Sequence, residues 1–151
     1  MVKKKTAELV KKFTEAAEDV RTVEGLRELL EELREYASTA VSVAKTDEKA
    51  LNAARFYGEL EDAVKEIVSS TFANEAMTES GKRWYGPSTS EAIARAMVEG
   101  VAEGLSGREL VQYIVDVTGR AISTIRHWLS ELGEEELARE ARRMERARYG
   151  V

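Results

Sequence analysis

Apolar residues recur at alternating steps of three and four along the first half of this sequence, and this spacing constrains the fold more than any other feature. In residues 23–45 the repeat consists of Leu26, Leu29, Leu33, Tyr36, Ala40 and Val43. In residues 48–78 it consists of Ala53, Tyr57, Leu60, Val64, Ile67 and Thr71. This spacing aligns apolar side chains along one side of an α-helix and is typical of coiled-coil seams. We therefore expect two long amphipathic helices.

The short connection between these two helices predicts that they pair as an antiparallel hairpin. Thr22 is expected to cap the first of these two helices, and Thr46 or Asp47 the second. Five further apolar residues widen the stripe of the second helix: Ala50, Ala54, Val68, Phe72 and Ala76. One neighbouring helix is too narrow to cover this wider stripe. The cover is expected from a first helix at 4–20, from the C-terminal part or from a second chain, and we favour a homodimer.

The rest of the chain also has the pattern of helices, so the expected fold class is all-α, a helical bundle. Pro87 is the only proline, and no segment alternates apolar and polar residues between two turns as a strand would. The segment SGKRWYGPSTS, residues 80–90, is the one clear interruption. We divide the chain there into a helical hairpin for dimerisation or partner docking, 1–80, and a second helical domain, 81–151.

Serine and glycine residues mark the ends of the helices in the second domain. The helices are expected at 89–103, 107–118, 121–132 and 134–148. Two capping boxes, each a serine followed three residues later by a glutamate, are predicted: Ser88 with Glu91 and Ser106 with Glu109. Three glycines are expected to end helices: Gly104, Gly119 and Gly133. The C-terminal part is therefore expected to be a series of short helices joined by tight turns.

The composition argues against several kinds of functional site. There is no cysteine and only one histidine, His127, so disulfides, thiolate chemistry and histidine-based metal sites are not expected. The sequence has no phosphate-binding glycine loop, HExxH motif or nucleophile–histidine grouping. We therefore expect a protein that is not an enzyme and that needs neither a cofactor nor a metal.

The distribution of charge and apolar residues bears on location and partners. The apolar runs are too short to cross a bilayer, and the basic N-terminus lacks the apolar region of a signal peptide, so we expect a cytoplasmic protein that does not bind membranes. Charged residues make up 34% of the chain, whereas Asn and Gln number three, a composition that resembles thermophile proteins. The net charge is −5, but residues 104–151 contain eight basic and eight acidic residues. A local basic surface can therefore form near the C-terminus.

Residues 104–132, GLSGRELVQYIVDVTGRAISTIRHWLSEL, combine a helix, a glycine turn and a second helix. In the first helix the residues expected to face inward are Leu110, Val111 and Ile114. Gly119 permits a sharp turn. The second helix is expected to be anchored by Ile125, Trp128 and Leu129. Its remaining residues form a polar face: Ser123, Thr124, Arg126, His127 and Ser130.

This segment resembles the helix-turn-helix of DNA-binding proteins, over 29 of the 151 residues. The resemblance implies that the helix at 121–131 contacts duplex DNA. Arginine can pair with the acceptor edge of guanine, and serine, threonine and histidine can donate to phosphates or base edges. The residues that the resemblance implies as DNA contacts are Arg120, Ser123, Thr124, Arg126, His127 and Ser130.

The segment departs from the usual motif at three places. The helix before the glycine is about one turn longer, Val115 stands where a small residue is common, and Arg120 and Ala121 replace an apolar residue and a good helix cap. A second helix that begins later, with Ser123 as its cap, would turn His127 towards the core. We prefer the earlier start.

Two other segments are candidates for contacts with nucleic acid. In the last predicted helix four arginines lie at helical spacing and form one basic stripe: Arg139, Arg142, Arg143 and Arg146. Such a stripe can neutralise phosphates, although it can also be a solvated surface balanced by Glu140 and Glu145. The loop KRWY, residues 82–85, mixes basic and aromatic residues as a base-stacking site does, but packing of its rings onto the hairpin is the preferred interpretation.

The sequence therefore predicts a DNA-binding protein, such as a transcriptional regulator or a DNA-organising or partition protein. A homodimer would place two helix-turn-helix segments on half-sites about 34 Å apart, one turn of DNA. The alternative is a non-enzymatic helical module for protein–protein interaction, or a subunit of a larger assembly.

Overall fold

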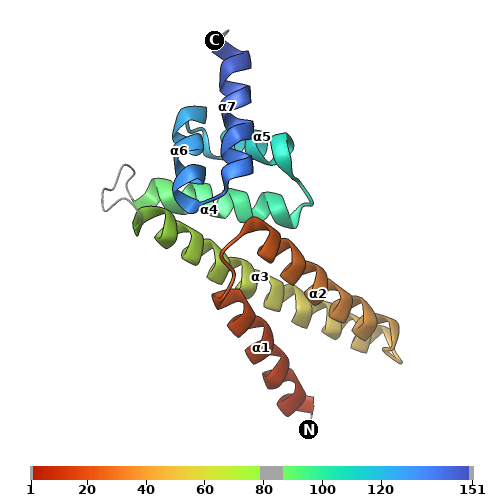
Figure 1. Cartoon of the computed structure of the whole chain (residues 1–151). Helices are drawn as coiled ribbons and strands as arrows, with labels where there is room; N and C mark the ends of the chain where they lie inside the picture. The colour runs from red at the N-terminus through yellow and green to blue at the C-terminus, as the bar shows by residue number, and fades with distance from the viewer. Residues whose placement is uncertain (1, 79–86, 150–151) are drawn as a thin grey trace.

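The structure, a computed structural model, describes residues 2–78 and 87–149, and in these ranges the chain is helical apart from its short connections (Figure 1). The helices are α1 (Val2–Glu18), α2 (Val23–Ser42), α3 (Asp47–Thr78), α4 (Pro87–Ala102), α5 (Gly107–Thr118), α6 (Ile122–Leu132) and α7 (Glu135–Tyr149). The prediction of an all-α fold and a helical bundle is confirmed. Each predicted helix is present, and its ends lie within three residues of the predicted ones.

The long helix α3 connects the two parts of the molecule. It contains 32 residues, and α1 and α2 lie along its first part whereas α4 crosses its C-terminal end (Figure 1). Of the last three helices, α5 packs on α4, α6 packs on α3, and α7 contacts both α5 and α6. The position of α6 is therefore set by α3 and by the other C-terminal helices together.

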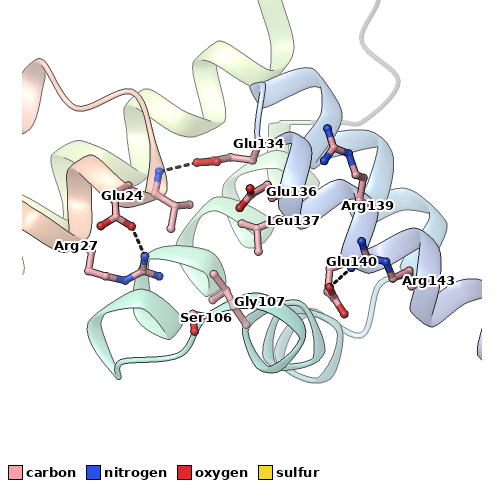
Figure 2. A pocket seen from close by; sticks show the side chains of 12 residues that line it. Glu24, Arg27, Ser106, Gly107, Glu134, Glu136, Leu137, Arg139, Glu140 and Arg143 are labelled. Carbon is pink, nitrogen blue, oxygen red and sulfur yellow. Dashed lines mark hydrogen bonds and ion pairs between the residues drawn. The ribbon is translucent and has the colours of Figure 1, made fainter.

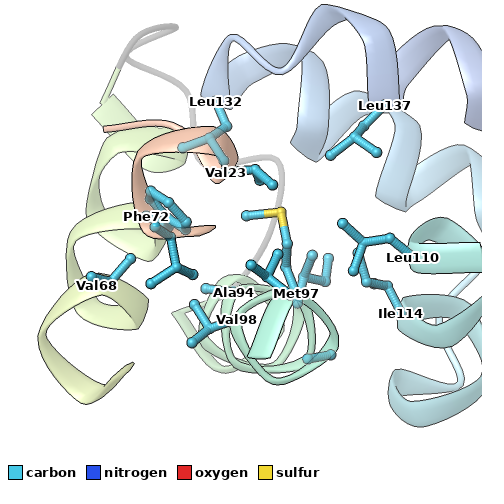
Figure 3. Close-up of a cluster of buried hydrophobic side chains, with 14 of the residues drawn as sticks. Val23, Val68, Phe72, Ala94, Met97, Val98, Leu110, Ile114, Leu132 and Leu137 are labelled. Atoms are coloured by element: carbon cyan, nitrogen blue, oxygen red, sulfur yellow. The ribbon is translucent and has the colours of Figure 1, made fainter. Parts of the chain in front are cut away.

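One cluster of buried apolar side chains extends through the whole molecule, from Phe13 in α1 to Met144 in α7. Near its centre Met97 of α4 lies among side chains from five other helices (Figure 3). These neighbours include Val23, Phe72, Leu110, Leu132 and Leu137. The core is thus continuous across the predicted boundary at residue 80, and the division into two domains stays a prediction from the sequence.

Several predicted helix ends are confirmed. Thr22 caps α2, because its Oγ1 accepts a hydrogen bond from the backbone N–H of Gly25 at 2.9 Å. Of the two candidates before α3, Thr46 is the cap, and its Oγ1 accepts from the backbone N–H of Lys49 at 3.1 Å. Gly119 ends α5 in the left-handed region, with a φ of 65°, where residues with a Cβ are strained.

The two predicted capping boxes are wrong. Helix α4 begins at Pro87, so Ser88 lies inside the helix rather than at its cap. Proline is favoured at the first helical position because its fixed φ suits the helix and its missing N–H is not needed there. Ser106 is the N-cap residue of α5, with an extended backbone, but its side chain makes no capping hydrogen bond to the described residues.

The predicted heptad seam of α3 holds only in the first part of the helix. The large apolar side chains of α3 that are buried are those of Tyr57, Leu60, Val64, Val68 and Phe72, at steps of three and then four; the small residues Ser69, Ala73 and Ala76 are buried as well. Ile67 and Thr71, which the seam includes, are only half-buried. A straight helix of 3.6 residues per turn drifts from a 3.5-residue repeat, so its buried side rotates as its neighbours change along its length.

The extra apolar width of α3 is covered within one chain at Val68, Phe72 and Ala76, whereas near the start of the helix Ala50 is half-buried and Ala54 is exposed. Phe72 is fully buried, and so are Phe13 and Ala17 of α1, which packs on α3. Helices α4 and α6 contact α3 as well. The first helix and the C-terminal part therefore provide the cover, and the central part of α3 needs no second chain.

The seam of α2 is only partly covered. Its inner residues Leu26, Leu29 and Leu33 are buried, but Tyr36 is 37% exposed and Val43 is 69% exposed. Leu51 of α3, close to the same end, is 60% exposed. The outer end of the α2–α3 pair thus has an apolar surface. None of the helices in the described ranges is both long enough and apolar enough to cross a membrane.

Candidate nucleic-acid interface

Helices α5 and α6 are joined by three residues, 119–121, and both bury the residues that the sequence predicts. Leu110, Val111 and Ile114 of α5 are fully buried, and so are Ile125, Trp128 and Leu129 of α6. Helix α6 begins at Ile122, and His127 is exposed. The preferred register is therefore confirmed, and the alternative with Ser123 as the cap is wrong.

A buried chain of hydrogen bonds fixes α6 to the body of the protein. The indole Nε1 of Trp128 donates to Oγ of Ser90 in α4 at 2.9 Å. The same hydroxyl donates to the backbone carbonyl of Ala73 in α3 at 2.9 Å. Both side chains have no exposed surface. Because the ring can make this bond in only one orientation, it also fixes which side of α6 faces outward.

Most of the polar residues that the sequence implied lie on the side of α6 away from Trp128, but Thr124 is four residues before Trp128 and so shares the side of the ring, and Arg120 precedes the helix. Arg120, His127 and Ser130 are exposed, whereas Ser123, Thr124 and Arg126 are half-buried. Ser123, His127 and Ser130 are spaced by four and three residues and so lie along one line of the helix. The surface of α6 therefore carries short hydrogen-bonding side chains with one histidine in the middle.

Arg126 has an intramolecular partner that the sequence analysis did not assign to it. Its Nε donates to Oε1 of Glu145 in α7 at 3.1 Å. The two side chains are 20% and 24% exposed. From the sequence, Glu145 was expected to act only as a counterion for the arginines of its own helix. No spacing rule connects residues 19 positions apart on different helices, so this pairing needs the three-dimensional structure.

The arginine stripe of α7 lies on the exposed surface, but it is not simply a continuation of the α6 surface. Arg139, Arg142, Arg143 and Arg146 are all exposed. Arg143 is paired with Glu140 at 2.7 Å, as expected for one of the balancing carboxylates. Arg139 and Arg143 line a groove that includes no residue of α6 (Figure 2). At least these two arginines therefore border a groove that is separate from the surface of α6.

This groove, of about 440 Å³, lies between the start of α2, the start of α5 and helix α7 (Figure 2). Oε1 of Glu134 crosses to α2 and accepts a hydrogen bond from the backbone N–H of Val23 at 2.6 Å. The charged side chains that line the groove are Glu24, Arg27, Glu134, Glu136, Arg139, Glu140 and Arg143. Acidic and basic groups alternate around it, so the groove has no clear preference for an anion or a cation.

Three further features concern the candidate site: the KRWY loop, possible metal ligands and Ser90. The loop residues 82–85, including Trp84 and Tyr85, lie outside the described ranges. Within those ranges no group of three or more histidine, aspartate and glutamate side chains is arranged to hold a metal ion. Ser90 supports α6 through its hydrogen bond to Trp128, and the sequence did not predict this contact because nothing in a run of small residues distinguishes a buried serine from an exposed one.

Comparisons with protein-family models, with curated proteins and with solved structures give no match to this chain.

Proposed function

We propose that the protein binds duplex DNA and inserts the exposed side of α6 into the major groove. The observation that carries this proposal is the two-sided character of α6. One side is fixed by the buried residues Ile125, Trp128 and Leu129, and the other offers Ser123, His127 and Ser130 to the outside. A short polar helix that follows a tight turn and is held rigidly on its inner side is what a recognition helix requires.

The chemistry of this surface suits DNA. The major groove is about 12 Å wide and admits an α-helix, whose short side chains can then reach base edges. Serine and threonine hydroxyls donate to or accept from base edges and phosphates, and Arg120 at the start of α6 can contact a phosphate. The exposed arginines Arg142 and Arg146 of α7 are further candidates for phosphate contacts.

The net charge of −5 supports a selective rather than an adhesive mode of binding. A protein with a net negative charge gains little from unspecific attraction to phosphates, so its affinity must come from a local fit. This is consistent with a transcriptional regulator or a DNA-organising or partition protein that acts at chosen sites.

The experiment that tests this proposal begins with selection of a preferred duplex from a random pool by the purified protein. Fluorescence anisotropy then gives the Kd for that duplex over a range of salt concentrations. We expect affinity to fall as salt rises, because phosphate contacts release counterions. Arg126→Ala should weaken binding by about 1–3 kcal/mol if Arg126 contacts a guanine.

The matched control is Arg55→Ala, which removes the same charge from an exposed position on α3. This variant should bind the preferred duplex as the wild type does. If no duplex binds at low salt, the proposed function is wrong. If both variants bind equally well, Arg126 does not contact the DNA.

A second candidate function, protein–protein interaction, is favoured by the apolar surface at the outer end of α2 and α3. The exposed apolar residues there are Tyr36, Val41, Val43 and Leu51. A hollow of about 360 Å³ beside them is lined by Glu35, Tyr36, Thr39, Ala40 and Tyr57. We propose that a second copy of this chain docks on this end. A dimer would carry two copies of α6, which is the number that two DNA half-sites require.

A further inference from the structure

We propose that Glu145 is a specificity-determining residue for the DNA contact. Its carboxylate neutralises the charge of Arg126. The guanidinium of Arg126 then donates to the uncharged acceptor edge of a base more readily than to a phosphate. This inference rests on the proposed function, because it concerns how the α6 surface chooses among DNA ligands.

The geometry of the pair gives Glu145 this influence. Arg126 and Glu145 are joined by one bond, from Nε to Oε1 at 3.1 Å, and each side chain is less than a quarter exposed. Charges in such partly buried positions are screened by salt less than charges on the open surface. Any acceptor that approaches the guanidinium of Arg126 is therefore also exposed to the negative charge of Glu145.

The atoms that Glu145 uses leave the rest of the guanidinium for another acceptor. The bond to Glu145 occupies Nε, and no described residue is seen to accept from Nη1 or Nη2. These two terminal nitrogens can donate parallel bonds to two acceptors, as to O6 and N7 of guanine or to two oxygens of a phosphate. The geometry of donors alone does not separate a base from a phosphate.

The charge of the acceptor distinguishes a base edge from a phosphate. A phosphate bound by Arg126 would bring a second negative charge close to Glu145, and like charges in a partly buried position repel. A guanine edge carries no net charge and meets no such repulsion. Glu145 also holds a long side chain in one position, which reduces the conformational entropy that Arg126 loses on binding. Both effects favour readout of a base.

A neighbouring pair on the same helix provides a matched control. Glu140 is bonded to Arg143. The Glu140 side chain is 23% exposed, about as much as that of Glu145, but its arginine partner is 67% exposed and so lies in solvent. Glu145→Gln and Glu140→Gln each remove one negative charge from α7 and keep the shape of the side chain. Only the first variant changes the charge beside Arg126.

The test measures the Kd of both variants and the wild type for the preferred duplex and for a scrambled duplex, as a function of salt. For Glu145→Gln we expect binding to the scrambled duplex to tighten roughly threefold to tenfold, with a salt slope steeper by about one, because Arg126 can then engage a phosphate. Affinity for the preferred duplex should change by less than about twofold, since the base contact remains. Glu140→Gln should shift both duplexes by the same factor.

For each variant, the affinity for the preferred duplex is divided by the affinity for the scrambled duplex. The proposal is overturned if this ratio is the same for Glu145→Gln and Glu140→Gln. It is also overturned if selection finds no preferred duplex for a wild-type protein that does bind DNA. A complete lack of DNA binding would instead contradict the proposed function, so the two failures differ. Thermal melting of each variant shows that the chain is folded.

A third variant, Arg126→Gln, decides which group Arg126 contacts. Loss of affinity for the preferred duplex with an unchanged salt slope supports contact with a base. A slope that is shallower by about one means that Arg126 neutralises a phosphate, and the proposal is then wrong. If this variant unfolds, the double variant Arg126→Gln/Glu145→Gln replaces it, because it leaves no unpaired carboxylate at position 145. Its affinity for the preferred duplex and its salt slope are then compared with those of Glu145→Gln alone, and the same two outcomes decide.

Discussion

Trp128 donates its indole N–H to the hydroxyl of Ser90, and this bond of 2.9 Å joins α6 to α4 in the interior of the protein. The hydroxyl of Ser90 in turn donates a hydrogen bond to the backbone carbonyl of Ala73 in α3. The helix proposed to contact DNA is thus connected by hydrogen bonds to the longest helix of the fold. The same contact that stabilises the core determines which residues of α6 face outward.

Truncation of the ring should destabilise the whole protein. Trp128→Ala removes a side chain with no exposed surface and leaves a cavity among α3, α4 and α6. We expect the free energy of unfolding to fall by about 3–5 kcal/mol, measured by chemical denaturation and circular dichroism. A loss of only a few tenths of a kcal/mol would mean that the ring is exposed in solution.

Removal of the hydroxyl tests the hydrogen bond separately from the packing. Ser90→Ala leaves the indole N–H of Trp128 buried without a partner, and an unsatisfied buried donor costs about 1–3 kcal/mol. Ser88→Ala is the control, because Ser88 is exposed on the same helix. That variant should stay within about 0.5 kcal/mol of the wild type. Equal stability of the two variants would show that the buried bond contributes nothing.

Two glycines inside helices should respond to alanine with opposite signs. A Cβ at Gly100 would lie 2.5 Å from Cδ1 of Leu110 and 3.1 Å from Cδ2 of Tyr113. Leu110 is fully buried and cannot move aside, so Gly100→Ala should destabilise the protein by about 1–2 kcal/mol despite the gain in helix propensity. A Cβ at Gly58 meets nothing within 4 Å, and Gly58→Ala should stabilise α3 by about 0.5–1 kcal/mol. Thermal melts compare the two, and a stabilised Gly100→Ala would mean that α4 and α5 are packed less closely.

The mass in solution tests the proposed dimer. Light scattering at micromolar concentration should give about twice the 16.8 kDa of one chain. Val43→Glu and Leu51→Glu should return the mass to that of a monomer with unchanged helicity, because both side chains are exposed within one chain. Phe72 is not suited to this test, since it is fully buried and a charge there would unfold the protein. A wild-type mass of one chain would rule out the dimer at this concentration.

The sequence predicted the helices well because their signals are local. Steps of three and four in apolar residues depend only on the period of the helix, and Gly119 and Thr22 act on backbone groups within a few residues. The buried side of α6 was predicted for the same reason. Where the local rules competed, they were less reliable: Ser88 has the spacing of a capping box, yet Pro87 starts the helix before it.

Features that depend on distant parts of the chain did not follow from the sequence. The seam of α3 was extended to Ile67 and Thr71 because a heptad repeat assumes one constant neighbour. In the fold, α3 meets α1, α2, α4 and α6 in turn. The partner of Arg126 was missed because Glu145 belongs to another helix, and the sequence grouped it with the arginines beside it.

The central claim is that the outward side of α6 meets duplex DNA, and titration of the isotopically labelled protein with its preferred duplex tests it most directly. Backbone amide resonances in a ¹H–¹⁵N correlation spectrum report each residue separately, and the scrambled duplex serves as the reference. We predict that residues 120–131 show the largest changes, with His127 and Ser130 among them, while the amides of α1 and of the first half of α3 change little. Changes that are absent, or that are confined to the outer end of α2 and α3, would contradict the account.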